Sequence, residues 1–472
     1  MIKKILKALS EISSGHKVYI VGGWLRDKLL KKENRDLDLA VSGDARKFAK
    51  TLSGKLKGRL VVLDEKNKVF RIILKHNTDL DYIDVSAMKG PSIEKDLGRR
   101  DFSVNSIAAA IENPAGMIDP RGGIKDIKKK IVRMTDKKCF SDDPLRMLRA
   151  FRIASELKFK IEPSTLRRIR KDAPLIRKSA GERIREELCR IFADTGSSGW
   201  IAQIDKSGLL EKLLPEISVM KQSARSFYFH PNGLWQHSIE TLASLEEIFR
   251  NLSGLFHENS GRIREYLNEP VSRASTRGTL LKLVALLHDI AKPACAKRAG
   301  NRMRFIGHDK KGAEMIARAF ERLKMSRKET RAAQNIVSHH MRPISLGQAN
   351  VLTSRASVRL FKATADNLPM LLLLSLADCY SYRRLKVKKA VELKKMRQVV
   401  RDLFSRYFAE KERSSRPRII DGHMIMKKFK LKPGPVIGKL LNAVSEAQMM
   451  GKISTSEEAL ALARKTLTRY KK

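Results

Sequence analysis

The chain has 472 residues, which corresponds to about three domains of ordinary size. Its hydrophobic content of 42% is enough for packed cores and excludes a wholly disordered protein. Lysine and arginine number 97 against 51 acidic residues, so the net charge of +46 predicts a polyanionic partner, nucleic acid in preference to an anionic membrane.

The sequence also predicts a cytoplasmic protein without a membrane span. No apolar run reaches the roughly 18 residues that a span needs, and the longest, Leu368 to Ala377, is followed by an acid. The four cysteines form no CxxC pair, which is typical of inert thiols in a reducing compartment.

Strand and helix patterns alternate up to about residue 135, after an amphipathic helix at the very start of the chain. This mixture predicts an α+β head with a small mixed sheet. The four short runs rich in β-branched and aromatic residues are Lys17–Val21, Leu60–Leu63, Phe70–Leu74 and Leu80–Val85.

From about residue 140 the apolar residues recur every three or four positions, which predicts an almost entirely helical remainder. Prolines 144, 163 and 174 stand at expected helix starts. Breaks near 220–233, 383–399 and 412–418 suggest the boundaries. The predicted domains are a head (1–135), a helical neck (136–220), a histidine-containing domain (221–385) and a basic helical tail (386–472).

A glycine turn follows the first candidate strand of the head. Gly22 and Gly23 stand between that strand and a helix that contains Arg26 and Asp27. Such a turn lets the backbone approach a phosphate, and the arginine supplies positive charge. An ordinary turn is the alternative for this feature taken alone.

Asp36 and Asp38 lie two residues apart and lead into an apolar run. On a strand, both carboxylates point to the same side, and two such charges are costly unless a cation shares them. Mg²⁺, which prefers oxygen ligands, is the expected cation. Asp84, inside another strand pattern, is a candidate third acid.

Arginines beside acidic and amide side chains follow in two further segments. The first holds Arg100, Asp101 and Asn105, a combination suited to a triphosphate and a sugar. In the second, Asp143, Arg146, Arg149 and Arg152 recur every three residues, which predicts a stripe along one helix. A plain basic helix face is the alternative.

The ordered set of motifs resembles that of the class II tRNA nucleotidyltransferases, the family of CCA-adding enzymes and bacterial poly(A) polymerases. The resemblance covers roughly residues 18–190. The motifs are GGWLRD, DLDLAV, RRDFSVNSIA, DPRGG, DDPLRMLRAFR and GERIREEL.

The resemblance implies that Asp36 and Asp38 hold two Mg²⁺ ions and that tRNA, CTP and ATP are the partners. One ion activates the RNA 3′-hydroxyl and the other stabilises the departing pyrophosphate. Asp143 and Arg146 read the base edge in place of a template. The residues expected at the nucleotide are Gly22, Gly23, Arg26, Asp27, Arg100, Asp101, Asn105, Asp143, Arg146, Arg149 and Arg152.

Two departures from the family pattern bear on nucleotide choice. Asp142 replaces the Glu that opens the base-reading motif, and residues 85–99 are short for the flexible loop of many CCA-adding members. Members with that loop reduced include enzymes that add only C. Addition of CC alone is therefore an alternative to complete CCA, and a poly(A) polymerase is a further one.

A second constellation lies in the predicted histidine domain. Imidazole and carboxylate side chains suit divalent metals. The pattern H…HD…D, on His237, His288, Asp289 and Asp378, resembles that of HD phosphohydrolases, and His308, His339 and His340 resemble their additional ligands. This implies a divalent metal and a phosphate-ester substrate, a cyclic nucleotide or an RNA 2′,3′-cyclic phosphate. A domain that keeps its ligands for structure alone is the alternative.

The tail has a Pro433-Gly434-Pro435 turn before an apolar helix and resembles the C-terminal region of long bacterial tRNA nucleotidyltransferases. The resemblance implies contact with the tRNA backbone. The basic runs at 167–171 and 383–389 are expected to bind tRNA by phosphate and shape. Two alternatives to the whole hypothesis are an HD phosphohydrolase with a relic head and a non-enzymatic RNA-binding protein.

Overall fold

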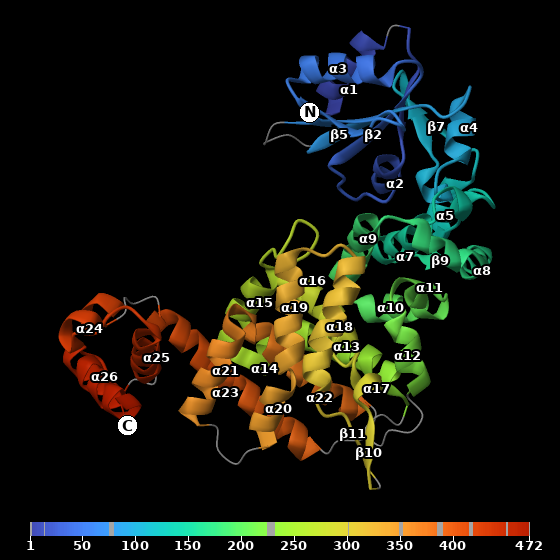
Figure 1. Ribbon diagram of the computed structural model, residues 1–472. Coiled ribbons are helices and arrows are strands. Elements are labelled where there is room, and N and C mark those ends of the chain that lie inside the picture. Colours follow the sequence, from blue (N-terminus) through green and yellow to red (C-terminus); the bar gives the residue numbers. More distant parts are fainter. Residues whose placement is uncertain are drawn as a thin grey trace. The chain divides into compact units, whose positions relative to one another are not determined.

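The structure is a computed structural model, and it describes residues 2–13, 15–74, 80–223, 232–300, 302–348, 353–384, 390–414, 419–449 and 452–471. The chain divides into two compact units (Figure 1). The first comprises 1–194 with 200–213, and the second comprises 195–199 with 214–472. The head and most of the predicted neck thus lie in one unit, and the histidine domain and tail in the other. The boundaries between the four predicted domains stay predictions.

In the described part of the first unit, seven strands form one mixed sheet in the order β3-β4-β5-β2-β1-β6-β7. Strands β2 and β5 are parallel, and the other neighbours are antiparallel. This confirms the predicted α+β head. The strands of the unit are β1 (Val18–Val21), β2 (Asp36–Val41), β3 (Arg59–Asp64), β4 (Val69–Ile73), β5 (Tyr82–Ala87), β6 (Ala108–Ala110), β7 (Asn113–Ile118), β8 (Ile131–Val132) and β9 (Lys160–Ile161).

All four predicted strand runs form strands, but the fourth begins later than expected. Strand β5 begins at Tyr82 because its pairing with β2 begins there, opposite Asp36. The β-branched and aromatic residues of β1 suit its inner position in the sheet, between β2 and β6. The inner strands place the two acids of β2 near the centre of the sheet.

Helices cover the sheet and form the neck. Helix α1 begins at Ile2, as predicted, and buries Ile5 and Leu9. Asp44 caps α3 by accepting from the backbone N–H groups of Arg46 and Lys47. The helices of the unit are α1 (Ile2–Ile12), α2 (Gly23–Leu29), α3 (Ala45–Leu56), α4 (Ile93–Gly98), α5 (Gly123–Lys129), α6 (Cys139–Asp142), α7 (Arg146–Leu157), α8 (Pro163–Asp172), α9 (Gly181–Ala193), α10 (Ser197–Lys206) and α11 (Leu209–Leu213).

The predicted stripe of four residues on one helix is wrong at its first member. Asp143 lies before α7 in extended backbone, with φ −145° and ψ 101°. Pro144 follows it, and a residue before proline avoids the helical region for steric reasons. Only Arg146, Arg149 and Arg152 share the helix.

The second unit is helical, as predicted, and its core is formed largely by α13, α16, α19 and α22. The helical stretch Ser354–Arg383, which contains α21 and most of α22, is long and apolar enough to cross a membrane by length and composition. However, 72% of its apolar 18-residue segment is buried inside the protein, so this segment is part of the core. The helices are α12 (Glu216–Gln222), α13 (Leu234–Arg250), α14 (Leu252–Phe256), α15 (Ser260–Asn268), α16 (Arg277–Leu287), α17 (Lys292–Cys295), α18 (His308–Arg322), α19 (Arg327–His339), α20 (Met341–Gln348), α21 (Ser354–Thr364), α22 (Leu368–Arg384), α23 (Ala390–Ser414), α24 (Gly422–Phe429), α25 (Pro435–Met449) and α26 (Ser456–Lys471).

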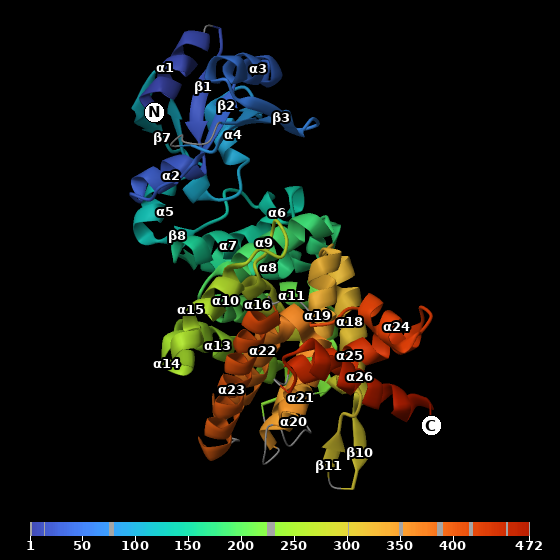
Figure 2. The ribbon, with the colours of Figure 1, turned by 90° about the vertical axis from the view of Figure 1, so that its left-hand side faces the viewer.

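One feature of the second unit is not predicted by the helical pattern. Strands β10 (Lys297–Ala299) and β11 (Arg302–Arg304) form a two-stranded hairpin between α17 and α18. Both side views show it extending beyond the neighbouring helices (Figures 1 and 2). A Gly-Asn pair between the strands is the turn signal that sequence reasoning missed.

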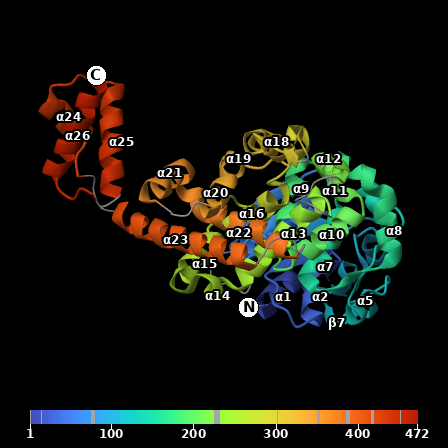
Figure 3. The ribbon, with the colours of Figure 1, turned by 90° about the horizontal axis from the view of Figure 1, so that it is seen from below.

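Helices α24, α25 and α26 pack around a small core of their own (Figure 3). Thr455 and Glu458 form a cap at the start of α26, each accepting from the backbone N–H of the other. Of the predicted breaks, residues 224–231, 385–389 and 415–418 lie outside the described residues. The fully buried members of the core are Ile425, Leu440, Ala459 and Ala463, with Ile420, Val444 and Ile437 close to them in burial.

Candidate nucleotide cleft and metal centre

The glycine turn of the head brings the backbone against the acids of β2. Gly22 has φ +77°, which a residue with a Cβ rarely adopts. A Cβ at Gly22 would lie 3.0 Å from Oδ2 of Asp38 and 3.3 Å from Nη1 of Arg100. The glycine is required here because its side-chain position is taken by the functional groups of the site.

Asp36 and Asp38 lie on the same side of β2, as predicted, and Asp84 stands opposite Asp38 in the parallel strand β5. Tyr82 donates its hydroxyl hydrogen to Asp36 at 2.6 Å. Arg71 binds both oxygens of Asp84 at 2.7 Å. Asp84 is thus neutralised by an arginine, whereas Asp36 and Asp38 remain the acids available to a cation.

The electrostatics of Asp38 favour a bound cation. Burial raises its pKa to about 6, the charges of Asp84 and Asp36 act in the same direction, and Arg100 opposes them. A divalent cation between two carboxylate oxygens removes this penalty, and hard oxygen donors suit Mg²⁺. The donor set therefore fits a divalent metal.

Several residues predicted to contact the nucleotide instead bind one another. Arg26 donates to both oxygens of Asp27 at 2.8 Å and to Oδ1 of Asn105 at 2.6 Å. Asn105 donates to Asp101 at 3.1 Å, and Arg149 donates to Asp101 at 3.3 Å. These hydrogen bonds fix the positions of the five side chains relative to one another.

The chain continues through Glu187 of α9, a buried acid that sequence reasoning did not single out. Its two oxygens accept from Arg149 at 3.4 Å and from Arg152 at 2.6 Å. Burial acts to raise the pKa of Asp101, but Arg149 and the Asn105 amide outweigh it and leave that pKa below its ordinary value. Asp101 and Glu187 thus hold Arg149 and Arg152 in place beside the site.

A cleft of about 1190 Å³ lies within the first unit, beside these residues. Of the predicted nucleotide-binding residues it is lined by Arg100, Asp143 and Arg146. Basic side chains outnumber acidic ones in its wall, so the cleft is suited to a polyphosphate. Arg99 and Arg121, which stand in the quoted motifs RRDFSVNSIA and DPRGG, and Arg183 of GERIREEL also line it; the basic residues outside those motifs are Lys89, Lys95, Lys138 and Lys178.

The two predicted base-reading residues face the cleft from different backbone segments. Arg183 of α9 donates to the oxygens of Asp143 at 2.8 and 3.4 Å. Arg146 donates to the carbonyl of Arg99 at 3.0 Å. Each side chain is held by the protein, so the pair offers a fixed set of donors and acceptors to a base.

The loop between β5 and α4 is short, as the sequence indicates. It runs from residue 88 to 92. The backbone N–H of Lys89 donates to the buried carboxylate of Asp96 at 2.8 Å, and Arg100 donates to the other oxygen of the same acid at 3.2 Å. Asp96 thus links this loop to the arginine beside Asp38.

The histidine domain brings most of its predicted ligands to one buried point. His237 comes from α13, His288 and Asp289 from the end of α16, and Asp378 from α22. His237 Nε2 lies 3.2 Å from Asp378 Oδ1 and 3.4 Å from Asp289 Oδ2. The ligand atoms form two groups, each within 4.8 Å: His237, His288 and Asp378, and Asp289, His308 and His340.

The ring orientations are those of metal ligands. His288, His308 and His340 each direct Nδ1 to a backbone carbonyl, at 2.8, 2.7 and 2.6 Å respectively. The Nδ1 of His237 lies 3.0 Å from the hydroxyl of Ser381. The Nε2 atoms are thereby turned to the centre, an arrangement in which outer partners orient the ligands.

Asp289 joins the two groups electrostatically. Burial acts to raise its pKa, but His288 and the ammonium of Lys292, 2.5 Å from Oδ2, hold it well below its ordinary range. The His288 pKa is raised because Asp289 and Asp378 outweigh the effect of burial. The deprotonated acid suits a bridging position between two cations.

The predicted additional ligand His339 is not brought into either group. Its Nδ1 lies 2.8 Å from the carbonyl of Asn335, within its own helix. Neighbouring residues on a helix point about 100° apart, so only His340 of this adjacent pair reaches the centre. Lys292, which sequence reasoning did not single out, lies at the centre, where its ammonium contacts Asp289.

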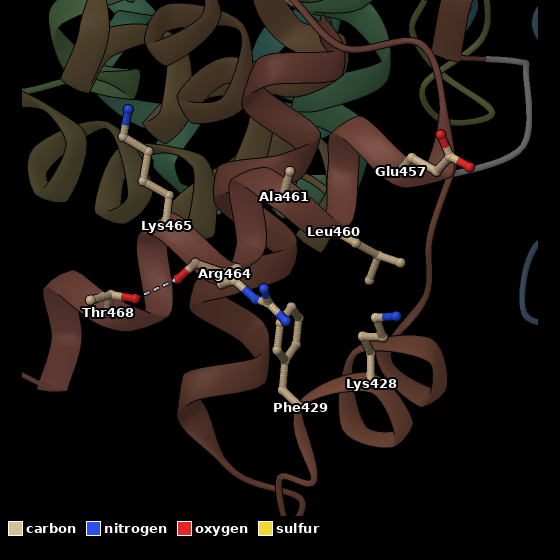
Figure 4. A pocket seen from close by; sticks show the side chains of 8 residues that line it. All are labelled: Lys428, Phe429, Glu457, Leu460, Ala461, Arg464, Lys465 and Thr468. Atoms are coloured by element: carbon tan, nitrogen blue, oxygen red, sulfur yellow. Dashed lines mark hydrogen bonds between the residues drawn. The ribbon is translucent and has the colours of Figure 1, made fainter.

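The C-terminal helices carry an open groove of about 560 Å³ between α24 and α26. Lys428, Arg464 and Lys465 are exposed along it, and the ring of Phe429 forms part of its wall (Figure 4). Basic side chains around an aromatic ring suit a nucleic-acid backbone with a stacked base.

The chain matches four families of known domains. They are the poly A polymerase head domain at 18–133, the probable RNA- and SrmB-binding site of polymerase A at 158–220, the HD domain at 234–383, and tRNA nucleotidyltransferase domain 2 at 310–463. The first matches the segment that contains the acids of β2, and the third contains the clustered histidines.

Curated relatives align along nearly the whole chain. An A-adding tRNA nucleotidyltransferase of Deinococcus radiodurans is 29% identical over 94% of this chain and 94% of its own length. A CC-adding tRNA nucleotidyltransferase of Synechocystis is 29% identical over 94% of this chain and 92% of its own.

Solved structures share the fold. A CCA-adding enzyme in complex with CTP has a TM-score of 0.67 and 21% identity, over 99% of this chain and 94% of that one. The Thermotoga maritima CCA-adding enzyme with tRNA has a TM-score of 0.63 and 21% identity, over 99% and 95%. The acids of β2 thus lie in a segment that matches the poly A polymerase head domain, the ligand cluster lies in one that matches the HD domain, and along nearly its whole length the chain is similar to tRNA nucleotidyltransferases.

Proposed function

We propose that the protein is a cytoplasmic enzyme that adds C, A or both to the 3′ ends of tRNA from CTP and ATP. The reaction forms a bond between the RNA 3′-oxygen and the α-phosphorus of the nucleotide and releases pyrophosphate. The observation that carries this proposal is the pair Asp36 and Asp38 beside Gly22, at a basic cleft within the same unit.

Asp36 and Asp38 are the residues that would hold Mg²⁺ in the head. When bound, Mg²⁺ supplies charge stabilisation for the attacking and leaving oxygens. Arg100 lies at the boundary between these acids and the cleft, and is placed to bind the triphosphate. Arg146 and Asp143 offer donors and acceptors to the base, and the other predicted binders fix their geometry through Asp101 and Glu187.

The tRNA itself is bound by positive charge outside the cleft. We assign this role to the exposed arginines and lysine of α8 and to the groove between α24 and α26. Contacts to phosphate position an RNA without reading its sequence. This agrees with a substrate recognised by its shape and its 3′ end.

Incorporation of labelled nucleotide tests the proposal and separates its alternatives. We expect labelled CTP or ATP to be added to tRNA that ends before CCA or after CC, in Mg²⁺. Addition of two C residues without A identifies a CC-adding enzyme, and long A tails on generic RNA identify a poly(A) polymerase. Failure to incorporate either nucleotide into any of these RNAs refutes the proposal.

Alanine at Asp36 or Asp38 is expected to abolish incorporation and preserve RNA binding. The matched control is Asp81→Ala, an exposed acid beside β5 that does not line the cleft. Unchanged incorporation by either catalytic variant contradicts the assigned metal role.

We further propose that the HD domain is a metal-dependent phosphohydrolase, because six buried ligand residues converge there. His237, His288, Asp289, His308, His340 and Asp378 would hold the metal, which supplies a Lewis acid and an activated water. His288→Ala and Asp289→Ala are expected to remove phosphodiester hydrolysis and spare nucleotide addition. Loss of both activities in a folded variant favours a structural domain.

A further inference from the structure

The β10–β11 hairpin concentrates positive charge on a short projecting element. Lys297, Arg298 and Arg304 are exposed, and none of them forms a salt bridge to another described residue. With three residues in each strand, the hairpin extends by about 10 Å. It is a narrow basic arm rather than part of a broad charged surface.

The pairing of its strands places like charges together. Lys297 stands directly opposite Arg304 in the antiparallel register. Directly opposed like charges destabilise a strand pair, and an isolated two-stranded hairpin is only marginally stable. A bound polyanion between these side chains would remove the repulsion, so the arrangement favours an anionic ligand over a purely structural role.

Both ends of the hairpin are joined to the HD metal centre. Before it comes Lys292, whose ammonium contacts Asp289. After it comes Phe305, whose carbonyl lies 2.7 Å from Nδ1 of His308 and whose ring centroid lies 5.7 Å from the ammonium of Lys292. A polyanion on the arm therefore lies next to the residues that orient the metal ligands.

We infer that the β10–β11 hairpin is an RNA-binding arm that leads a single-stranded RNA end to the HD centre. On this inference the phosphate ester accepted by this centre belongs to a polynucleotide, whose backbone has phosphates for both the arm and the centre. The inference rests on the proposed function in one respect, that RNA is the polyanion this enzyme encounters.

RNA is favoured over an anionic membrane surface by the placement of the charges. Arginine and lysine on a narrow ribbon match a chain of separate phosphates. The adjacent exposed apolar residue is Ile306, 81% exposed. One such side chain is suited to stacking against a base and is too little apolar surface to anchor a membrane-bound protein.

The experiment is a local cross-link in the full-length chain. Ile306 is replaced by p-benzoylphenylalanine, and the protein is irradiated with labelled single-stranded RNA. We expect the RNA to cross-link at this position. The variant K297A/R298A/R304A in the same background is expected to lower the yield at least about tenfold, whereas R327A/K328A/R331A, an equal loss of exposed charge on α19, leaves it unchanged.

A second measurement uses the unmodified chain and so does not depend on how the variants fold. Trypsin cleaves after Lys297, Arg298 and Arg304, and we expect RNA to protect these three bonds. Bound RNA without protection or cross-link overturns the inference, as does a cross-link that persists in the arm variant. Arm-dependent binding to phosphatidylserine vesicles without any RNA cross-link also overturns it.

Neither readout requires catalysis. Both are repeated with the Asp36→Ala variant, which by the proposed function adds no nucleotide. Arm-dependent cross-linking by a wild-type chain that incorporates no nucleotide would support the arm while the proposed function fails. Incorporation by the wild-type chain without a cross-link would refute the arm and leave the proposed function standing.

Discussion

The guanidinium of Arg183 donates to both carboxylate oxygens of Asp143, so the acid predicted to read the base is held by an arginine of helix α9. Asp143 lies in extended backbone before a proline, and no helix of its own fixes its side chain. The fork of Arg183 fixes two oxygens at once, which an ammonium cannot do.

Arg183→Ala is therefore expected to reduce selectivity between nucleotides more than it reduces rate. The backbone N–H of Leu145 still donates to Oδ1 of Asp143 at 3.2 Å, but without Arg183 the carboxylate is less constrained and accepts from the wrong base more readily. We expect about a tenfold fall in the ratio of correct to incorrect kcat/KM, or ~1.4 kcal/mol. The selectivity of Arg183→Lys is expected to lie between that of wild type and that of Arg183→Ala. The control is Arg190→Ala, an exposed change on the same helix. An unaltered ratio in Arg183→Ala would contradict this positioning role.

Asp38→Asn is expected to abolish nucleotide addition and yet stabilise the metal-free protein at pH 8. The pKa of Asp38 rises from 3.8 to about 6, so its ionised form is disfavoured in the folded state. Stability from this group is present at low pH and is lost as the pH rises through about 6. The full shift corresponds to ~3 kcal/mol, reduced here because the side chain is partly exposed.

Thermal unfolding in EDTA at pH 5 and pH 8 measures this effect. The gain of Asp38→Asn over wild type should be larger at pH 8. Equal gains in stability at both pH values, or a loss of stability at pH 8, would show that ionised Asp38 does not destabilise the folded protein. Incorporation by wild type should fall as the pH is lowered, because protonation removes a cation ligand.

Mn²⁺ is expected to stabilise the second unit through the HD centre. At a hundredfold excess over Kd the gain is about 2.7 kcal/mol. His288→Ala should lose most of it, whereas His339→Ala, a matched histidine outside both ligand groups, should keep it. Calorimetry with and without Mn²⁺ is the measurement, and equal behaviour of the two variants would exclude the assigned ligand set.

Metal binding at that centre should weaken as the pH falls from 8 to 6. The pKa of His288 is raised, so a proton competes with the metal at a higher pH than for an ordinary histidine. Titration of Mn²⁺ at three pH values tests this, and an affinity independent of pH would contradict it.

The groove between α24 and α26 is expected to contribute to tRNA affinity. The variant K428A/R464A/K465A removes three phosphate partners. It should make the slope of log K against log salt less steep by about 2–3. The control K427A/K432A/K452A removes equal charge outside the groove. Filter binding over a salt series measures both, and identical slopes would show that the groove takes no part.

The sequence alone indicated the similarity to tRNA nucleotidyltransferases, the α+β head, the helical remainder and most of the candidate site residues. These follow from local features: the two acids at strand spacing, the glycine turn before them, and the histidines in helical patterns. His237, His288, Asp289 and Asp378 were selected from the chain without knowledge of their distances, and the structure gathers all four.

The tertiary structure decided what each polar group does. Arg26, Arg149 and Arg152 are predicted at the nucleotide from the sequence, and the structure adds that Asp27, Asp101 and Glu187 hold them in place, because a buried acid must be paired. Glu187 lies 35 residues after Arg152, so no local pattern predicts that contact. The same reason separates His339 from His340: sequence places both on one helix, and only packing decides which of two neighbouring side chains reaches the centre.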